Sequence, residues 1–230
     1  MVSRSFTDLV TSGEPDLAPL LLAFSEEIGR SMATPDDERA IRSDRLREWI
    51  ARRAAALAAL GERSPSAQLA ALHRHVCLGL DTAAARPLDT RLRDLRPDYV
   101  CRSGAGHPAV ATALVAAAAQ EAGRPVDVIV SPSTETMLLA VRDHPEAGAI
   151  EYGAGVLMPA RELGDRLDLR WVCAHEVAAI LLELVALRAA ELGLHPAHVA
   201  ARAMGTKLPL EFTARQRLDV QLARARSAYN

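Results

Sequence analysis

Residues 108–123 restrict the possible folds of this chain more than any other segment. Their sequence, PAVATALVAAAAQEAG, is apolar on nearly every side when it is drawn as a helix. Such a helix has to be surrounded by other structure, because a surface helix keeps one polar face toward water. Only 3% of the residues are aromatic, so the core around this helix has to be built mainly from Ala, Leu and Val.

Further helices and strands are expected on both sides of this central helix. Apolar residues with a helical period, bounded by Gly or Pro, predict amphipathic helices at 16–30, 36–60, 65–80, 171–192, 196–204 and 213–228. Short β-branched or apolar runs predict paired strands at 125–130 and 137–142, with a further strand and tight turn within 149–158. This order predicts an α+β fold. We expect a helical layer at 1–80, a core at 81–168 and a helical segment at 169–230, all in one compact unit.

The composition argues against several classes of function. Lys and Arg total 27 against 29 Asp and Glu, so no basic field is present to attract nucleic acid. No apolar stretch is long enough for a membrane span or signal peptide. The three cysteines are too few and too widely spaced for a disulfide framework. We therefore expect a cytoplasmic protein that binds neither nucleic acid nor membranes.

Metal sites and cofactors are not expected either. His73, His75 and Cys77 do not lie on one face of a helix. The sequence HEVAA, which starts at His175, lacks the second His that a metalloprotease helix carries four residues later. We interpret it, with Cys173, as part of one helix whose polar side faces outward.

Four weak motifs follow one another in the predicted core. They are Arg102, Gly104 and Pro108 at a turn into the central helix, Gly123-Arg124-Pro125-Val126, Pro132, and Glu151-Tyr152-Gly153-Ala154-Gly155. In order and spacing they resemble the bacterial transglutaminase-like core family, whose branch often carries tetratricopeptide-type helices after the core, over roughly residues 69–192. The resemblance implies a papain-like fold. In that fold a Cys at the start of the central helix, a His on one strand and an Asp on the next strand form a catalytic triad.

This chain departs from the family's triad at all three positions. The central helix starts with His107 instead of Cys, Glu135 stands in the segment that should supply the His, and Glu151 replaces the Asp. Without a thiolate and its base, ordinary acyl transfer has no nucleophile. Cys101 comes too early in the chain to be taken as its equivalent, although a shifted loop could bring it near the site. A free Cys in apolar surroundings is more often part of the core.

The residues at the triad positions are the predicted catalytic residues. His107, at a helix N-terminus, is either a neutral imidazole that can act in acid–base chemistry or simply a residue that caps the helix. Glu135 and Glu151 either form a polar cluster with it or are exposed acids at a turn and at a strand end. Both alternatives remain open at this point.

The neighbouring polar residues are the predicted ligand-binding residues: Cys101, Arg102, Thr134 and Tyr152. Arg102 either anchors a carboxylate of a ligand or pairs with Glu151 or Asp98.

Two functions from different classes fit these residues. The first is a non-hydrolytic pseudoenzyme that binds a protein partner or a small-molecule ligand. The second is an enzyme with rebuilt chemistry that acts on an acyl or amide-containing small molecule, with His107 and Glu135 or Glu151 as acid and base. The sequence sets neither the oligomeric state nor the ligand.

Overall fold

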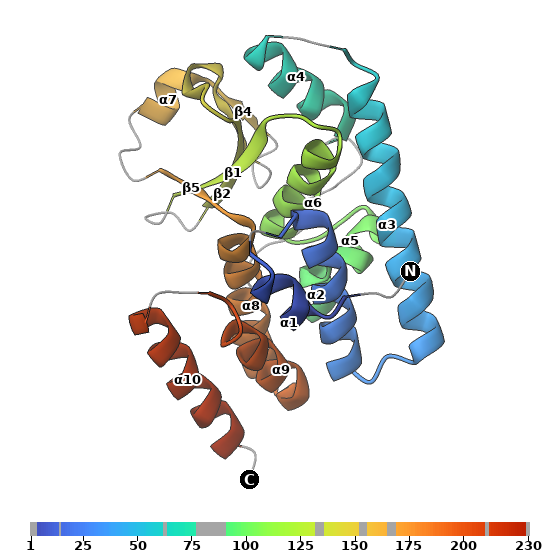
Figure 1. Cartoon of the computed structure of the whole chain (residues 1–230), viewed down its shortest axis with the longest axis vertical. Helices are drawn as coiled ribbons and strands as arrows, with labels where there is room; N and C mark the ends of the chain where they lie inside the picture. The colour runs from blue at the N-terminus through green and yellow to red at the C-terminus, as the bar shows by residue number, and fades with distance from the viewer. Residues whose placement is uncertain are drawn as a thin grey trace.

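The central helix predicted from the sequence is α6, Pro108–Glu121, and it lies between a layer of helices and the sheet (Figure 1). Every residue from Ala109 to Ala119 is buried. Pro108 occupies the first helical position, where its missing N–H has no partner to lose and its fixed φ suits the helix. The small side chains of α6 let α2 (Leu17–Ser31), α3 (Asp36–Ala58) and the strands approach it closely, which places the start of the helix inside the molecule.

The computed structural model describes residues 4–13, 15–61, 64–76, 91–131, 136–151, 156–164, 169–209 and 212–228. Within these ranges the chain is α+β, mostly helical, with one small antiparallel sheet. No helix in them is both long and apolar enough to cross a lipid bilayer.

The N-terminal layer consists of helices that pack on one another, and two of them, α2 and α3, also pack on α6. They are α1 (Phe6–Thr11), α2 (Leu17–Ser31), α3 (Asp36–Ala58) and α4 (Pro65–Val76). The predicted helices at 16–30 and 36–60 are confirmed, and the helix at 65–80 is confirmed as far as residue 76, beyond which the described range ends.

Two short helices between this layer and α6 were not predicted. They are the 3-10 helix η3 (Leu92–Leu95) and α5 (Pro97–Ser103). The only feature predicted near them was a turn into the central helix, at Arg102, Gly104 and Pro108. Pro97 starts α5 and Gly104, with φ 70°, ends it after seven residues. Two turns are too short for apolar periodicity to be visible in the sequence.

The sheet has five strands in the order β4-β3-β2-β1-β5, and all neighbours are antiparallel. Their bounds are β1 Val126–Ser131, β2 Thr136–Val141, β3 Ala149–Glu151, β4 Val156–Met158 and β5 Arg170–Val172. The predicted pairing of the first two strands is confirmed. The predicted strand within 149–158 corresponds to β3 and β4, and the predicted turn between them lies outside the described residues.

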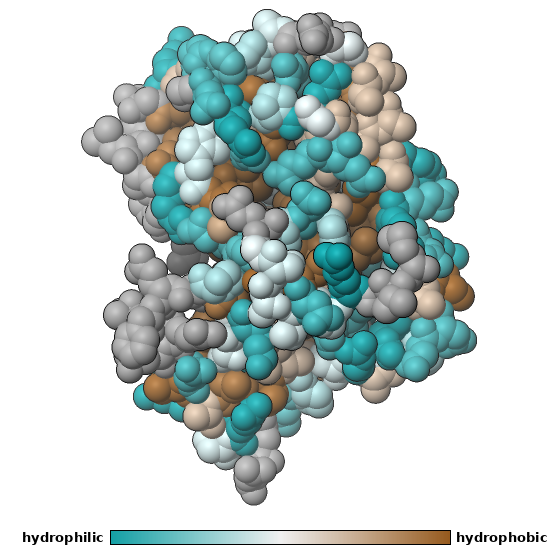
Figure 2. Space-filling model, in the orientation of Figure 1, coloured by the Kyte–Doolittle hydropathy of each residue, from teal (hydrophilic) through white to brown (hydrophobic). Residues whose placement is uncertain are grey.

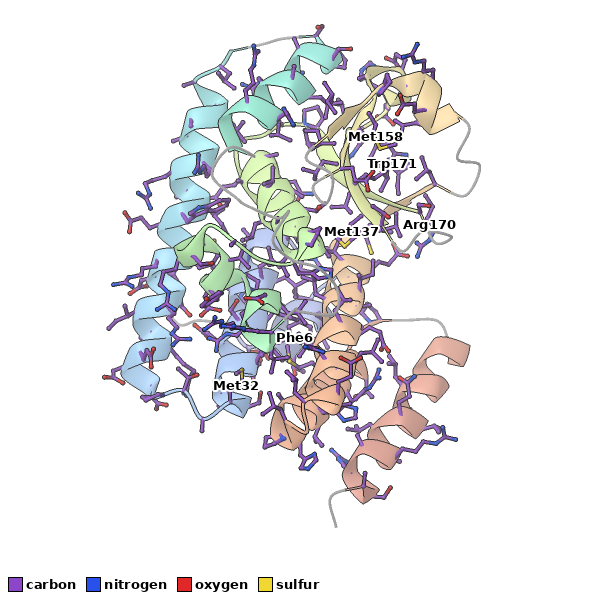
Figure 3. All side chains as sticks on the ribbon, turned by 180° about the vertical axis from the view of Figure 1, so that it is seen from behind. Phe6, Met32, Met137, Met158, Arg170 and Trp171 are labelled. Carbon is purple, nitrogen blue, oxygen red and sulfur yellow. The ribbon has the colours of Figure 1, made fainter. Side chains whose placement is uncertain are left out.

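The two faces of the sheet pack against different elements. Val128, Val130 and Leu139 belong to the main core that includes α6, so their face is turned toward the helices. Ile129, Leu138 and Met158 belong to a smaller apolar cluster on the other face, which Leu163 of the short helix α7 (Ala160–Gly164) also joins. Figure 3 shows Met137 between the sheet and the helices, and Met158 on the side turned away from them.

The C-terminal part contains α8 (Ala174–Glu191), α9 (His195–Gly205) and α10 (Phe212–Ser227). All three helices were predicted, but the start of the first was wrong. Residues 170–172 form the edge strand β5, and Cys173 caps a helix that begins after it. Three residues are too few to show either the alternation of a strand or the period of a helix. The sequence therefore could not separate a short strand here from a first helical turn. The main core runs from Phe6 in α1 to Leu208 after α9 and so takes in all three predicted ranges.

Candidate functional site

A glycine turn sets the position of His107 at the start of α6. Gly104 adopts the left-handed conformation that ends α5. Two residues later, a Cβ on Gly106 would lie 2.3 Å from Val100 Cγ2 and 3.0 Å from the carbonyl oxygen of Asp94. Gly106 therefore allows the turn to pack directly on α5 and η3, and the N–H of His107 donates to the carbonyl of Asp94 at 3.0 Å.

His107 is the N-cap residue of α6. Its Nδ1 accepts a hydrogen bond from the N–H of Ala109 at 3.2 Å. The ring is half-buried, and burial lowers the pKa of His107, with nearby Asp94 opposing that shift. The imidazole is therefore neutral near neutral pH. Because Nδ1 accepts, the ring proton lies on Nε2, which can donate but has no lone pair to take up a proton.

Cys101 does not have the surroundings of a nucleophile. It lies near the C-terminal end of α5 and packs against the main core. Burial, and then the charge of Asp98, raise the pKa of its thiol far above the ordinary value, although Arg53 opposes the shift. A reactive cysteine needs the opposite, a depressed pKa at a helix N-terminus or beside a cation. The thiol therefore stays protonated.

Arg102 lies against an aromatic ring. Its guanidinium is 5.3 Å from the centre of the Tyr99 ring, and that of Arg93 is 5.0 Å from the same ring. Cation–π contacts of this kind hold a guanidinium flat on the ring face. The alternative pairing of Arg102 with Asp98 is not formed, because Asp98 binds Arg96.

Glu151 leaves the sheet on the face away from His107. It is paired with Leu138 across β3 and β2, and directly opposed residues of antiparallel strands project to the same face. Leu138 belongs to the apolar cluster on the outer face, whereas α6 lies on the inner face. The structure therefore does not bring Glu151 and His107 together. Thr134, Glu135 and Tyr152 lie outside the described residues, so their roles stay predictions.

A buried ion pair beside this region was missed by the sequence analysis. The guanidinium of Arg96 donates to both carboxylate oxygens of Asp98, from Nη2 at 2.8 Å and from Nε at 3.1 Å. The two side chains are only 4% and 2% exposed. Arg42 of α3 approaches the same carboxylate at 3.8 Å. The signal in the sequence was Arg-Pro-Asp, which begins one residue before the first turn of α5.

A second buried arginine lies between the C-terminal helices. Arg202 of α9 forms a two-point ion pair with Glu183 of α8, and its Nη1 donates to Gln221 of α10 at 2.9 Å. Its side chain is 8% exposed. The three helices are thus joined at one polar point within an apolar interface.

His175 differs from our expectation of a polar side facing outward. It is buried, and its Nε2 has no hydrogen-bond partner among the described residues. Cys173 and Glu176 are accessible to water, and Glu176 binds the N–H of Cys173 and the side chain of Arg170. The sequence alone does not show whether an isolated His in a helical pattern is buried or faces water.

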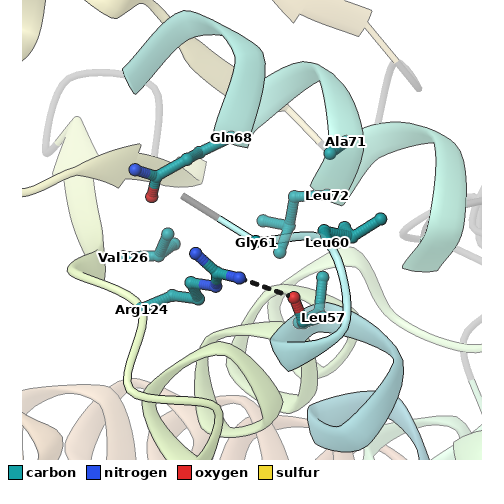
Figure 4. Close-up of a pocket in the computed structure, with 8 residues that line it drawn as sticks. All are labelled: Leu57, Leu60, Gly61, Gln68, Ala71, Leu72, Arg124 and Val126. Atoms are coloured by element: carbon teal, nitrogen blue, oxygen red, sulfur yellow. Dashed lines mark hydrogen bonds between the residues drawn. The ribbon is translucent and has the colours of Figure 1, made fainter. Parts of the chain in front are cut away.

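Two small cavities open between the described helices. The first, of about 10 Å³, lies between α3, α4 and the start of β1, and Arg124 crosses it to donate to the carbonyl of Leu57 at 2.8 Å (Figure 4). The second, of about 20 Å³, lies beside Arg202. Each has room for about one water molecule. Neither can hold an organic ligand, which needs roughly 300 Å³ or more.

Within the described ranges, no three His, Cys, Asp or Glu side chains gather where they could hold a metal ion. Comparison with protein-family models, with curated proteins and with solved structures finds no match to this chain. The resemblance to the transglutaminase-like family therefore has no support from known proteins, and what remains of that expectation is the α+β class.

Proposed function

We propose that this chain is a non-catalytic binding protein and that its partner is another protein. The proposal rests on the contacts and surroundings of the candidate residues that the structure describes. His107 caps α6, Cys101 is a partly buried, protonated thiol, and Arg102 stacks on Tyr99. Each of these side chains has a structural role, and none has the surroundings that acyl transfer requires.

The two cavities between the described helices are too small to enclose an organic ligand. A protein partner needs only an accessible surface. Leu187, Leu192 and Leu194 follow one another through the end of α8 and the turn into α9, and they are 51%, 45% and 39% exposed. Figure 2 also shows apolar side chains at the surface where α9 and α10 lie. Exposed apolar side chains that occur close together mark interaction surfaces.

Site-directed photocrosslinking in the host cell tests this proposal. A photoreactive amino acid in place of Leu187 is expected to give one discrete protein adduct. The same amino acid in place of Glu48, whose side chain is 65% exposed on α3, is the matched control and should give none. Identical adduct patterns at both positions would contradict a partner surface on the C-terminal helices.

The second candidate function is the enzyme with rebuilt chemistry. The observation that favours it is the half-buried, neutral imidazole of His107, whose Nε2–H can donate a hydrogen bond to a developing negative charge. Turnover of acyl esters and amides should be measured for the wild type, His107→Asn and His107→Ala. Non-catalytic binding predicts no turnover that depends on His107. Activity that is lost in both variants, while His107→Asn keeps its stability, would replace the first proposal with the second.

A further inference from the structure

The two edge strands of the sheet are covered by other elements to different degrees. At one edge, α4 contacts β4, and Pro159 directly follows the strand. At the other edge, β5 contacts β1 and the start of α8, and no other element in the described ranges makes an extensive contact with it (Figure 1). An uncovered edge strand presents backbone groups to which another strand can pair.

The backbone of Trp171 is turned toward this open edge. The N–H of Arg142 donates to the carbonyl of Pro125 at 2.6 Å, which fixes the phase of the β1–β2 ladder. Because bonded pairs alternate along antiparallel strands, the odd-numbered residues of β1 bond toward β2 and the even-numbered ones toward β5. Those even-numbered residues lie opposite Val172 and Arg170. The N–H and C=O of Trp171 therefore point away from β1.

The side chains of β5 leave this edge accessible. Trp171 is 43% exposed and lies on the outer face of the sheet, as its pairing with Ile129 requires (Figure 3). Edge strands are commonly protected by short length, charged side chains, a proline or a bulge. β5 is short, but it has no proline or lysine, and the charge of its Arg170 is balanced by an ion pair with Glu176.

We propose that β5 pairs in antiparallel orientation with β5 of a second copy of this chain, about a two-fold axis at Trp171. The two sheets then become one continuous sheet across the dimer. Trp171 lies opposite Trp171 of the second copy, and because both backbones point to the seam, the two residues exchange two N–H to C=O hydrogen bonds.

The strand is self-complementary in this arrangement. The two indole rings meet on the same face, where cross-strand aromatic pairs are favourable. On the opposite face, Arg170 lies opposite Val172 of the second copy, next to the helix start that carries the second copy's Glu176. Each copy thus contributes one cation and one anion to the seam, and no charge is left without an opposite charge nearby.

A second copy fits this edge because the residue at the centre pairs with itself. The seam involves few residues on each side, so the dimer is weaker than obligate dimers, whose interfaces are far larger. This self-association does not depend on the proposed function, because it uses neither the start of α6 nor the exposed leucines of α8 and α9.

Disulfide trapping tests the position of the axis. Trp171→Cys, combined with Cys77→Ser and Cys173→Ser, is oxidised mildly and separated on a non-reducing gel. A residue that faces its own copy across antiparallel strands lies within disulfide reach of it, so a covalent dimer is expected. Ile41→Cys in the same background is the control, because Ile41 is an exposed apolar residue on α3. Equal trapping at both positions, or none at position 171, overturns the proposal.

Dilution experiments provide a test that does not use cysteine. Sedimentation equilibrium of the full chain should show a monomer–dimer equilibrium that Trp171→Lys weakens by at least about tenfold and Ile41→Lys leaves unchanged. If the lysine variant does not fold, Trp49→Phe makes Trp171 the sole tryptophan, and its emission should shift to shorter wavelength as the dimer forms. A constant monomer mass, an unshifted emission, or a dimer that Trp171→Lys does not weaken overturns the proposal.

Discussion

Two junctions of this molecule each contain a buried arginine, but they differ in how much water reaches the partner carboxylate. Where η3, α5 and α6 meet, Arg96 and Asp98 are 4% and 2% exposed. Where α8, α9 and α10 meet, Arg202 is 8% exposed, whereas Glu183 is 43% exposed. Two desolvated charges each depend on the other, while a carboxylate that remains in water is stabilised by its solvent as well. Removing the partner carboxylate should therefore destabilise the protein far more at the first junction than at the second.

The glycines at the two junctions differ in the same way. A Cβ on Gly106 would collide with Val100 and with the backbone of Asp94. A Cβ on Gly205 in α9 would meet Leu218 at 3.6 Å, an ordinary van der Waals contact. The η3–α5–α6 junction therefore has no room for a methyl group at position 106, whereas the C-terminal junction has room for one at position 205.

The largest expected effect comes from removing the buried carboxylate. Asp98→Ala leaves Arg96 buried without an opposite charge and should lower the free energy of unfolding by about 3–5 kcal/mol. Glu183→Ala should lower it by only about 1 kcal/mol, because water can take the place of the 43% exposed carboxylate and Arg202 keeps its hydrogen bond to Gln221. Urea denaturation followed by circular dichroism measures both. Equal losses at the two sites would remove the distinction between the junctions.

The glycine comparison should give effects of opposite sign. Gly106→Ala is expected to destabilise by about 1–3 kcal/mol, since the turn has to move away from α5. Gly205→Ala is expected to stabilise by about 0.5–1 kcal/mol, because alanine is the better helix former and its methyl group fits. Thermal and urea unfolding of the two variants give the signs. A neutral Gly106→Ala would show that the turn is not closely packed.

The cap of α6 should have a smaller effect. His107→Ala removes the side-chain acceptor for the N–H of Ala109 and should cost about 1 kcal/mol. His107→Asn is the matched control, because asparagine is a strong N-cap residue and should keep most of the stability. If both variants lose the same stability, the imidazole contributes through packing and not as a cap.

The smallest expected effect is a pH dependence that originates at the same residue. Burial lowers the pKa of His107 in the folded protein, so the unfolded chain binds the proton more readily. Stability from this residue is therefore fully present above about pH 6.5 and declines as the pH falls through the folded pKa. Urea midpoints measured over this range should show the decline, and His107→Asn should reduce it. A decline unchanged in the variant would assign the effect to other groups, such as His198, whose pKa is also lowered by burial.

Much of the fold could be predicted because its long elements carry strong periodic signals. Residues 109–119 are buried on all sides, and their apolar sequence predicted a helix surrounded by other structure. The apolar runs of β1 and β2 predicted paired strands in the same way. The elements that were missed are short. α5 and β5 have seven and three residues, so their identity is decided by what they pack against and not by a repeat in the sequence.

The candidate site was harder to predict because it depends on distances that no local pattern encodes. The sequence analysis placed His107 correctly at the start of α6 and left open whether it caps the helix. It could not show that Glu151 projects from the opposite face of the sheet, since a shift of one residue in register reverses the face. It could not show the Arg96–Asp98 pair either, because burial of a charge pair arises from the layer of helices placed over it.

The order of strands in the sheet has a consequence for how the protein folds. β1, β2, β3 and β4 are each paired with their neighbour in sequence, so their hairpins close short loops. β5 has to return past all of them to pair with β1, which involves contacts between distant parts of the chain, and these form slowly. We expect this strand to join the native structure last and its amides to exchange hydrogen early, unless self-association has protected them.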